Sequence, residues 1–240
     1  MSVTDKVVII TGSAGGIGRY VAKTFAWEGA KVVTADIKPL ETVADELEEI
    51  GVEHLEVPTD VRDEEAVHNM VGKTLDRFGR IDVLINNAAI VSHFQWGLPL
   101  WPKIRDMDRE FWHRVMDTNM GGIFLCTKHV LPHMEAQRSG HVVNTMGGGL
   151  SAYGVSKSAI PAFTRLLAEE EKDFNICVVT ISPGARIATE DAPAEARARM
   201  PGPEFVGNRF VLAAQAPMEL TGQWLNLEDG KLVGRGVGQD

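Results

Sequence analysis

The hydrophobic positions of this chain fall into short, largely apolar runs separated by longer segments of mixed polarity. The short runs are rich in Val and Ile, which is typical of strands buried on both faces of a sheet. We predict strands at Lys6–Ile10, Lys31–Ala35, Glu53–Val57, Ile81–Ile85, His141–Asn144, Ile176–Ile181 and Gln223–Leu227. Helices are predicted at Ile17–Glu28, Pro39–Ile50, Glu64–Phe78, Phe111–Met134 and Tyr153–Asp173. The alternation indicates a doubly wound α/β fold, with helices on both faces of a central parallel sheet of about seven strands.

No internal repeat or low-complexity linker divides the chain, so residues 1–240 are predicted to form a single domain. The longer segments without a periodic pattern are Ser92–Arg105, Met146–Ser151 and Ala185–Pro203, and each follows a predicted strand. In an open α/β sheet, ligands bind beyond the carboxyl ends of the strands. We therefore expect these three segments to border a binding site.

A glycine-rich loop, Thr11-Gly-Ser-Ala-Gly-Gly-Ile-Gly18, joins the first predicted strand to the first predicted helix. Gly12, Gly16 and Gly18 form a TGxxxGxG pattern. Glycines let the backbone turn tightly and approach a diphosphate, whose charge is stabilised by the amides at a helix N-terminus. An ordinary βα turn can also be rich in glycine, but the position directly after the first strand favours a Rossmann fold that binds a dinucleotide.

Asp36 ends the second predicted strand. A carboxylate there accepts hydrogen bonds from ribose hydroxyls and repels a 2′-phosphate, although a plain turn aspartate would occupy the same position. No Lys or Arg lies in the glycine loop before Gly18, which favours NAD over NADP, and the nearby Lys38 keeps the choice open.

Tyr153 and Lys157 are spaced i, i+4 at the start of a predicted helix, so their side chains share one face. A free tyrosine has a pKa near 10, and a neighbouring ammonium is expected to lower it. The phenol could then exchange a proton with an alcohol or a carbonyl oxygen. The YxxxK pattern alone is common on solvated helices and gains its meaning from the glycine loop earlier in the chain.

Together these motifs resemble the short-chain dehydrogenase/reductase family over nearly the whole chain. Similar to further family motifs are Asp60-Val61, Asn86-Asn87-Ala88-Ala89, Asp117-Thr118-Asn119, Ser182-Pro183-Gly184 and Leu220-Thr221-Gly222-Gln223. The resemblance implies an NAD(H)-dependent enzyme that interconverts a secondary alcohol and a ketone, with Tyr153, Lys157 and Asn119 catalytic. It assigns cofactor binding to Gly12, Ser13, Gly16, Ile17, Gly18, Asp36, Ile37, Asp60, Val61, Asn87, Ala88, Ala89, Tyr153, Lys157, Pro183 and Gly184. It also implies a homodimer or homotetramer paired through the long helices at 111–134 and 153–173.

The sequence departs from this family where a serine usually polarises the substrate oxygen. Aligning the strand at 142–144 places Gly147 there, in a loop that is short before Tyr153. Ser151 and Thr145 are candidate substitutes for that hydroxyl. Because the usual catalytic serine is missing, the protein could instead be a catalytically impaired homologue that binds a dinucleotide as a sensor or assembly subunit. The presence of Asn119, Tyr153 and Lys157 argues against this alternative.

Two further segments bear on the substrate. The stretch at 90–111 is longer than is usual in the family and carries His93, Phe94, Trp96 and Trp101, which could line an apolar pocket or form a surface flap or subunit contact. An apolar, cyclic or aromatic substrate is therefore expected. Arg186 replaces the usual aliphatic residue after Gly184, and Thr189 comes one position late. Arg186 or His93 could instead bind the anion of a hydroxy acid.

Composition narrows the list of partners. The chain of 240 residues has 24 Lys and Arg against 33 Asp and Glu, a net charge of −9, so nucleic acids and anionic membranes are poor partners. No apolar run is long enough to span a bilayer, and the polar start predicts no secretory signal. Cys126 and Cys177 lie in apolar runs and are expected to be reduced, as in a cytoplasmic protein. Pro132 separates His129 from His133, and no third ligand is evident, so no metal is expected.

Overall fold

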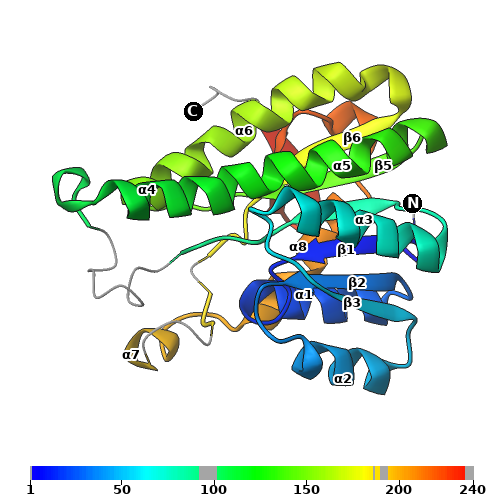
Figure 1. Ribbon diagram of the computed structural model, residues 1–240, viewed down its shortest axis with the longest axis horizontal. Helices are drawn as coiled ribbons and strands as arrows, with labels where there is room; N and C mark the ends of the chain where they lie inside the picture. The colour runs from blue at the N-terminus through cyan, green and yellow to red at the C-terminus, as the bar shows by residue number, and fades with distance from the viewer. Residues whose placement is uncertain (1, 92–101, 186, 190–193, 236–240) are drawn as a thin grey trace.

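The computed structural model describes residues 2–91, 102–185, 187–189 and 194–235. They form an eight-stranded sheet in the order β3-β2-β1-β4-β5-β6-β7-β8 (Figure 1). The strands are β1 (Val7–Thr11), β2 (Lys31–Asp36), β3 (His54–Pro58), β4 (Val83–Asn86), β5 (Gly140–Thr145), β6 (Ile176–Ile181), β7 (Trp224–Glu228) and β8 (Lys231–Arg235). The α-helices are α1 (Gly16–Trp27), α2 (Glu41–Ile50), α3 (Glu64–Phe78), α4 (Arg109–Met116), α5 (Gly122–Gln137), α6 (Ser151–Glu171), α7 (Ala194–Arg197) and α8 (Gly207–Ala213). The predicted doubly wound α/β fold is confirmed.

The strand order reverses at the centre of the sheet. β1 pairs with β2 on one side and with β4 on the other, both in parallel, so that Ile10 is opposite Thr34 and Ile85. The chain after β1 and the chain after β4 therefore leave the same edge side by side. Such a switch point opens the crevice in which α/β proteins bind ligands.

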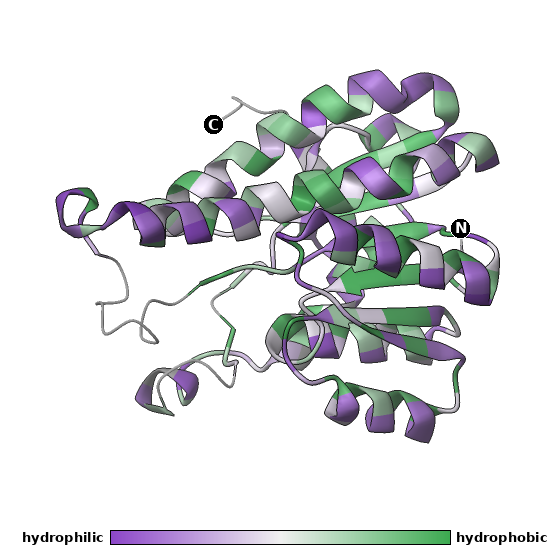
Figure 2. Ribbon diagram, in the orientation of Figure 1, coloured by the Kyte–Doolittle hydropathy of each residue, from purple (hydrophilic) through white to green (hydrophobic). Residues whose placement is uncertain are grey.

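The hydrophobic core lies in two layers, one on each face of the sheet. Val8 and Ile10 of β1 belong to the layer formed with α1, α2 and α8. Val7 and Ile9, which point the other way, belong to the layer formed with α3, α5 and α6. Figure 2 shows the consequence: the central strands are almost wholly hydrophobic, whereas the outer helices mix hydrophobic and hydrophilic residues.

β8 corrects the prediction of about seven parallel strands. It runs antiparallel to β7 at the edge of the sheet, after a turn at Asp229 and Gly230 with φ values of 48° and 75°. Positive φ at both central residues is the turn that best fits the twist of a hairpin. The sequence pattern missed β8 because the strand is half-exposed, bounded by Lys231 and Arg235, and lacks a run of buried residues.

The helices differ from the prediction in two places. The segment expected as one helix at 111–134 is α4 and α5 joined by a π-helix, Asp117–Gly121. The short helices α7 and α8 follow the irregular segment after β6 and were not predicted. Pro132 and Pro161 are accommodated inside α5 and α6. No helix in the described part of the chain is long and apolar enough to cross a membrane.

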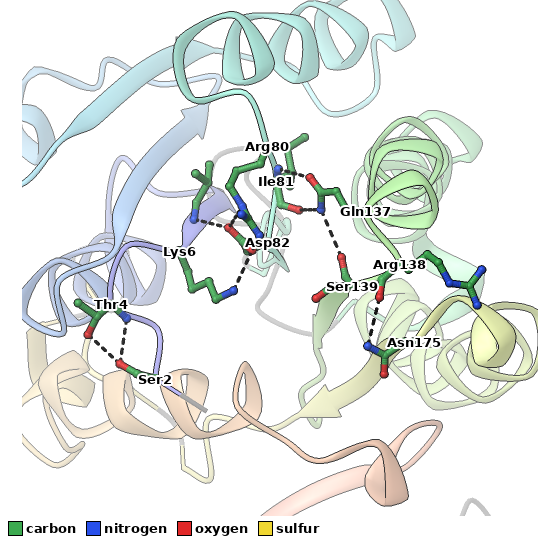
Figure 3. A network of polar contacts seen from close by, with 11 residues as sticks. Ser2, Thr4, Lys6, Arg80, Ile81, Asp82, Gln137, Arg138, Ser139 and Asn175 are labelled. Carbon is green, nitrogen blue, oxygen red and sulfur yellow. Dashed lines mark hydrogen bonds and ion pairs between the residues drawn. The ribbon is translucent and has the colours of Figure 1, made fainter.

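Charged contacts join the amino ends of the central strands (Figure 3). Asp82 is 5% exposed and accepts hydrogen bonds from Lys6 Nζ at 3.2 Å, the Val7 N–H at 3.0 Å, and Arg80 Nε and Nη2 at 2.9 and 2.6 Å. Burial opposes ionisation of this carboxyl, but the Arg80, Val7 and Lys6 donors outweigh it and lower its pKa. These contacts stabilise the amino ends of the strands. The predicted site residues lie at the opposite, carboxyl ends.

Candidate active site

The glycine loop is packed so closely that side chains are excluded. Gly12 and Gly16 have φ values of 68° and 53°, in the left-handed region that favours glycine. A Cβ at Gly12 would lie 2.7 Å from Ala88 Cα, and one at Gly18 would lie 2.0 Å from the carbonyl oxygen of Gly12. The loop thus brings a bare backbone to the N-terminus of α1, and Ile17 is half-buried just behind it. This cradle fits a dinucleotide diphosphate.

Thr11, which sequence analysis did not assign to the site, ties the glycine loop to the end of β4. Its hydroxyl donates to the carbonyl of Ile85 at 3.3 Å and accepts from the N–H groups of Asn87 and Ala88 at 3.1 and 3.2 Å. Asn87 Nδ2 in turn donates to the carbonyls of Thr11 and Gly12 at 3.1 and 3.0 Å. Gly12, Asn87 and Ala88 are therefore brought together as predicted. In the sequence, this role could have been inferred from the threonine at the start of the glycine motif, Thr11.

Asp36 lies over the glycine loop at the end of β2. Its carboxylate accepts hydrogen bonds from the Ala14 N–H and the Lys38 N–H, both at 2.9 Å. Ser13 is turned the other way, because its hydroxyl accepts from the Ala35 N–H at 2.9 Å and contacts the Ala35 carbonyl at 3.4 Å. The Ser13 N–H also donates to the Ala35 carbonyl, at 3.4 Å, so Ser13 holds the loop against β2.

Ile37, Ala89 and the loop after β3 complete this side. Ile37 is 68% exposed beyond Asp36, and Ala89 is half-buried after β4. Asp60 forms an ion pair with Arg62, which donates two hydrogen bonds through Nε and one of 2.6 Å through Nη2. These bonds lower the pKa of the Asp60 carboxyl. Val61 is buried against α5.

The π-helix places Asn119 between β4 and α6. Its side chain is fully buried; Oδ1 accepts from the Ile90 N–H at 2.8 Å, and Nδ2 donates to the Ile90 carbonyl at 3.2 Å and to Ser156 Oγ at 3.0 Å. Ser156 donates to the Tyr153 carbonyl at 2.8 Å. A single-turn π-helix is frequent at functional sites because it re-aims one side chain within a helix.

Tyr153 and Lys157 lie on the first turns of α6 and are buried, with 8% and 2% exposed. Lys157 Nζ donates to the carbonyl of Thr145 at 2.8 Å and lies 5.9 Å from the centre of the Tyr153 ring. Burial raises the pKa of Tyr153 to about 12 and lowers the pKa of Lys157 to about 8. The expected fall in the tyrosine pKa is therefore not produced by the protein alone, because the ammonium is bonded to Thr145 and both groups are withdrawn from water.

Gly147 lies beside the phenol, where the family alignment places the serine. A Cβ added at Gly147 would be 2.6 Å from Tyr153 Oη. Neither candidate substitute hydroxyl is available: Ser151 Oγ donates to Met107 Sδ at 3.1 Å, and Thr145 Oγ1 is enclosed without a partner among the described residues.

The loop after β6 carries Pro183 and Gly184. Gly184 has a φ of 83°, and a Cβ there would lie 2.7 Å from Cζ of Arg209 on α8, a residue that the sequence did not bring to attention. The contact between Gly184 and Arg209 could not be predicted from the sequence motifs, because Arg209 lies on α8, a helix that was not predicted. Arg186 lies outside the described residues, as do His93, Phe94, Trp96 and Trp101.

An open hollow lies at the N-terminal end of α6. Its volume is about 480 Å³, and it is lined by Pro102, Lys103, Ile104, Arg105, Leu150 and Ser151. Ile104 and Leu150 are 70% and 67% exposed. Apolar side chains beside two cationic ones provide room for a mainly apolar ligand.

The histidine pair does not form a metal site in the described structure. His129 Nε2 lies 3.0 Å from Glu64 Oε1, and no group of three His, Cys, Asp or Glu side chains suited to a metal occurs among the described residues.

Comparison with known proteins supports the family. The sequence model of the short chain dehydrogenase family matches residues 6–197. The chain is 39% identical to secoisolariciresinol dehydrogenase of Forsythia intermedia over 74% of this chain and 65% of that protein. It is 34% identical to a 3-oxoacyl-[acyl-carrier-protein] reductase of Synechocystis sp. over 97% of this chain and 99% of that one.

A solved structure, NAD+-bound xylitol dehydrogenase, superimposes with a TM-score of 0.82 at 26% identity and covers 93% of this chain and 98% of that chain. The glycine cradle, the paired Tyr153 and Lys157, and these similarities agree. The chain belongs to the short-chain dehydrogenase family, whose members are oxidoreductases that use a nicotinamide dinucleotide on alcohols or carbonyl compounds.

Proposed function

We propose that the protein interconverts a secondary alcohol and a ketone with NAD(H). The observation that carries the proposal is the position of Tyr153, Lys157 and Asn119 at the same edge of the sheet as the glycine loop. The first two side chains are buried together on α6, and the third is anchored to Ile90 at the end of β4. A buried phenol beside a buried ammonium suits proton exchange rather than simple binding.

Each of these residues has a distinct task in the proposed reaction. When bound, the nicotinamide dinucleotide supplies the ring carbon that exchanges a hydride with the substrate carbon. Tyr153 Oη gives a proton to the carbonyl oxygen in reduction and takes one from the alcohol in oxidation. The Lys157 ammonium, 5.9 Å from the phenol ring, stabilises the phenolate against the cost of burial. Asn119 fixes the chain after β4, which borders the site.

We further propose that NAD is preferred over NADP. The Asp36 carboxylate is held over the glycine loop by the Ala14 N–H at 2.9 Å. From there it can accept hydrogen bonds from the adenosine ribose hydroxyls, and its charge would repel a 2′-phosphate. The Lys38 N–H also donates to that carboxylate, at 2.9 Å.

We propose an apolar, cyclic or aromatic alcohol as the substrate. The hollow of about 480 Å³ presents Ile104 and Leu150 at the start of α6. Leu150 lies three residues before Tyr153, which would meet the substrate oxygen. Desolvation of a ring against such side chains would contribute much of its binding.

We propose that the protein assembles as a homodimer or homotetramer through α4, α5 and α6, each subunit being a single domain over residues 1–240. Phe124 on α5 and Val155 and Leu166 on α6 are 51%, 43% and 55% exposed. Large apolar side chains on neighbouring helices of one face are a feature of surfaces that pair.

The test of the main proposal is Tyr153→Phe. The ring and its packing remain, so NAD should bind as in the wild type, while turnover of 1-phenylethanol, cyclohexanol or acetophenone should fall by at least about 100-fold because the proton donor is gone. Binding is measured by calorimetry and turnover by nicotinamide absorbance. Wild-type turnover in this variant would contradict the assigned role of Tyr153.

Gly147 favours a second candidate, a dinucleotide-binding protein without turnover. The serine that polarises the substrate oxygen in the family has no side-chain counterpart there. Tight NAD binding by the wild type, with no turnover on a broad panel of secondary alcohols and ketones, would support this candidate instead.

A further inference from the structure

The backbone at Gly147 lies directly beside the phenol of Tyr153. A Cβ built on Gly147 would be 2.6 Å from Tyr153 Oη and 3.6 Å from Cζ. A Cβ built on the next residue, Gly148, would meet nothing within 4 Å. A substrate oxygen that bonds to Tyr153 Oη would therefore meet the peptide groups on either side of the Gly147 Cα.

Several N–H groups of this loop have no acceptor among the described residues, beginning with those of Gly147 and Gly148. In the described part of the chain, the N–H groups of Gly147 and Gly148 donate no hydrogen bond to the protein, whereas the N–H of Met146 just before them donates to Ile181 at 3.0 Å. Gly147 is half-buried and Gly148 is exposed. Backbone donors at such a position are normally satisfied by protein, water or a ligand.

The side chains that could replace the missing serine are committed or enclosed. Ser151 has a φ of 65° and donates to Met107 Sδ at 3.1 Å, on the side of the hollow. Thr145 Oγ1 has essentially no accessible surface, so an incoming substrate oxygen cannot reach it without rearrangement. This leaves the backbone amides of the loop as donors. The amide of Gly147 belongs to the residue whose Cβ position lies beside Tyr153 Oη, and that of Gly148 to the next residue.

We propose that the N–H groups of Gly147 and Gly148 do the work of the missing serine hydroxyl by donating hydrogen bonds to the substrate oxygen beside Tyr153. The inference rests on the proposed function. In reduction, the carbonyl carbon gains the hydride, negative charge grows on the oxygen, and Tyr153 Oη gives that oxygen its proton. The two N–H bonds stay intact throughout and stabilise the charge only electrostatically, as backbone donors do in oxyanion holes.

The arrangement also accounts for glycine at these positions. Any side chain at 147 would push against Tyr153 Oη, since 2.6 Å is shorter than real Cβ contacts. At Gly148 a Cβ would meet nothing within 4 Å, and φ is not in the left-handed region. Position 148 therefore tolerates a side chain, which makes it the place to test the amide itself.

The experiment compares Gly148→Pro with Gly148→Ala. Both add a Cβ, but only proline removes the N–H. Turnover is followed with 1-phenylethanol and NAD and with acetophenone and NADH, NAD affinity by calorimetry, and folding by thermal unfolding. We expect kcat of Gly148→Pro to lie about 100-fold below that of Gly148→Ala, with the same NAD affinity in both variants. Equal turnover in both variants would overturn the inference and leave the proposed function standing.

A second pair of variants tests which group donates to the substrate oxygen even if Gly148→Pro folds poorly. Thr145→Val and Ser151→Ala each remove one candidate hydroxyl, and neither should show the loss of about 100-fold in kcat that removal of an oxyanion donor causes. A loss of about 100-fold in either would assign the donor to that side chain and overturn the inference. A wild type that binds NAD but turns over no substrate of the panel would instead overturn the proposed function, and the inference with it.

Discussion

Burial changes the chemistry of Tyr153 and Lys157 more than their proximity to each other does. Tyr153 and Lys157 share one helix face, yet their pKa values move to about 12 and about 8, both away from the ionised form. Lys157 donates to the Thr145 carbonyl, which holds the ammonium in place without offsetting its loss of hydration. Keeping either group ionised therefore lowers the stability of the folded protein before any ligand binds, as is common at functional sites.

Lys157→Met tests this cost through the pH dependence of stability. Below a pH of about 8 Lys157 is protonated in both the folded and unfolded chain, and its burial penalty is present in full. Between about 8 and its ordinary value of 10.5, the unfolded chain holds a proton that the folded chain releases, so wild-type stability rises with pH. The methionine variant lacks this rise.

We expect the stability of Lys157→Met relative to the wild type to fall by about 3 kcal/mol between about pH 7 and about pH 10.5, from a shift of about 1.4 kcal/mol per pKa unit. Denaturant unfolding without NAD measures it. Tyr153 is present in both proteins, so its contribution to the pH dependence of stability cancels in the comparison. A difference that does not change with pH would show that Lys157 is not held at a cost.

Asp36→Ala tests cofactor choice at the same scale. The wild type should bind NAD far more tightly than NADP, and removal of the carboxylate should narrow the gap by at least about tenfold, because both the ribose acceptor and the repelling charge are lost. Calorimetry with the four nicotinamide dinucleotides measures the ratio. Equal affinities of the wild type for NAD and NADP would contradict the role of Asp36.

At the scale of secondary-structure elements, the π-helix links three parts of the site. It sits between α4 and α5 and turns Asn119 inward, where one amide bonds both backbone groups of Ile90 and the hydroxyl of Ser156. The end of β4 is thereby fixed relative to the first turns of α6. A regular helix through 117–121 would rotate this side chain away from its partners.

Asn119→Ala removes all three bonds and leaves both backbone groups of the half-buried Ile90 unpaired. We expect the free energy of unfolding to fall by about 2 kcal/mol and turnover to fall by more than about tenfold, since the loop after β4 loses its anchor. Denaturant unfolding and steady-state kinetics measure the two effects. Asn208→Ala, at an exposed position on α8, is the matched control and should change neither.

At the scale of the whole molecule, the two edges of the sheet serve different purposes. The amino edge is fastened by Asp82 with Lys6, Val7 and Arg80 (Figure 3). The carboxyl edge has glycine turns, unpaired backbone amides and the buried catalytic candidates.

Assembly is the prediction at this scale. Light scattering at micromolar concentration should give a dimer or tetramer, and the double variant Phe124→Glu, Leu166→Glu should dissociate it, because charges would be buried in an apolar interface. Trp27→Glu is the control: Trp27 is 61% exposed but lies on α1, which packs on the opposite face of the sheet. A monomeric wild type would contradict the proposed assembly.

The sequence by itself determined the features that depend on neighbouring residues. Val-rich runs such as Val7–Ile10 predicted buried parallel strands, and the glycine pattern predicted the cradle, since both follow from local steric and hydrophobic rules. The i, i+4 spacing placed Tyr153 and Lys157 on one face for the same reason. The alignment to the family placed Gly147 at the position of the usual serine, and the structure then showed that this position lies beside Tyr153 Oη.

Only the tertiary structure decided features that join distant parts of the chain. The Asn119–Ile90 bonds, which span 29 residues, required the π-helix, and β8 formed because β7 offered it an edge. The direction of the Tyr153 and Lys157 pKa shifts depended on burial, which no i, i+4 spacing reveals. Hydrogen-bond partners, solvent exclusion and edge pairing are set by which surfaces meet when the chain is packed, and that is why they could not be read from the sequence.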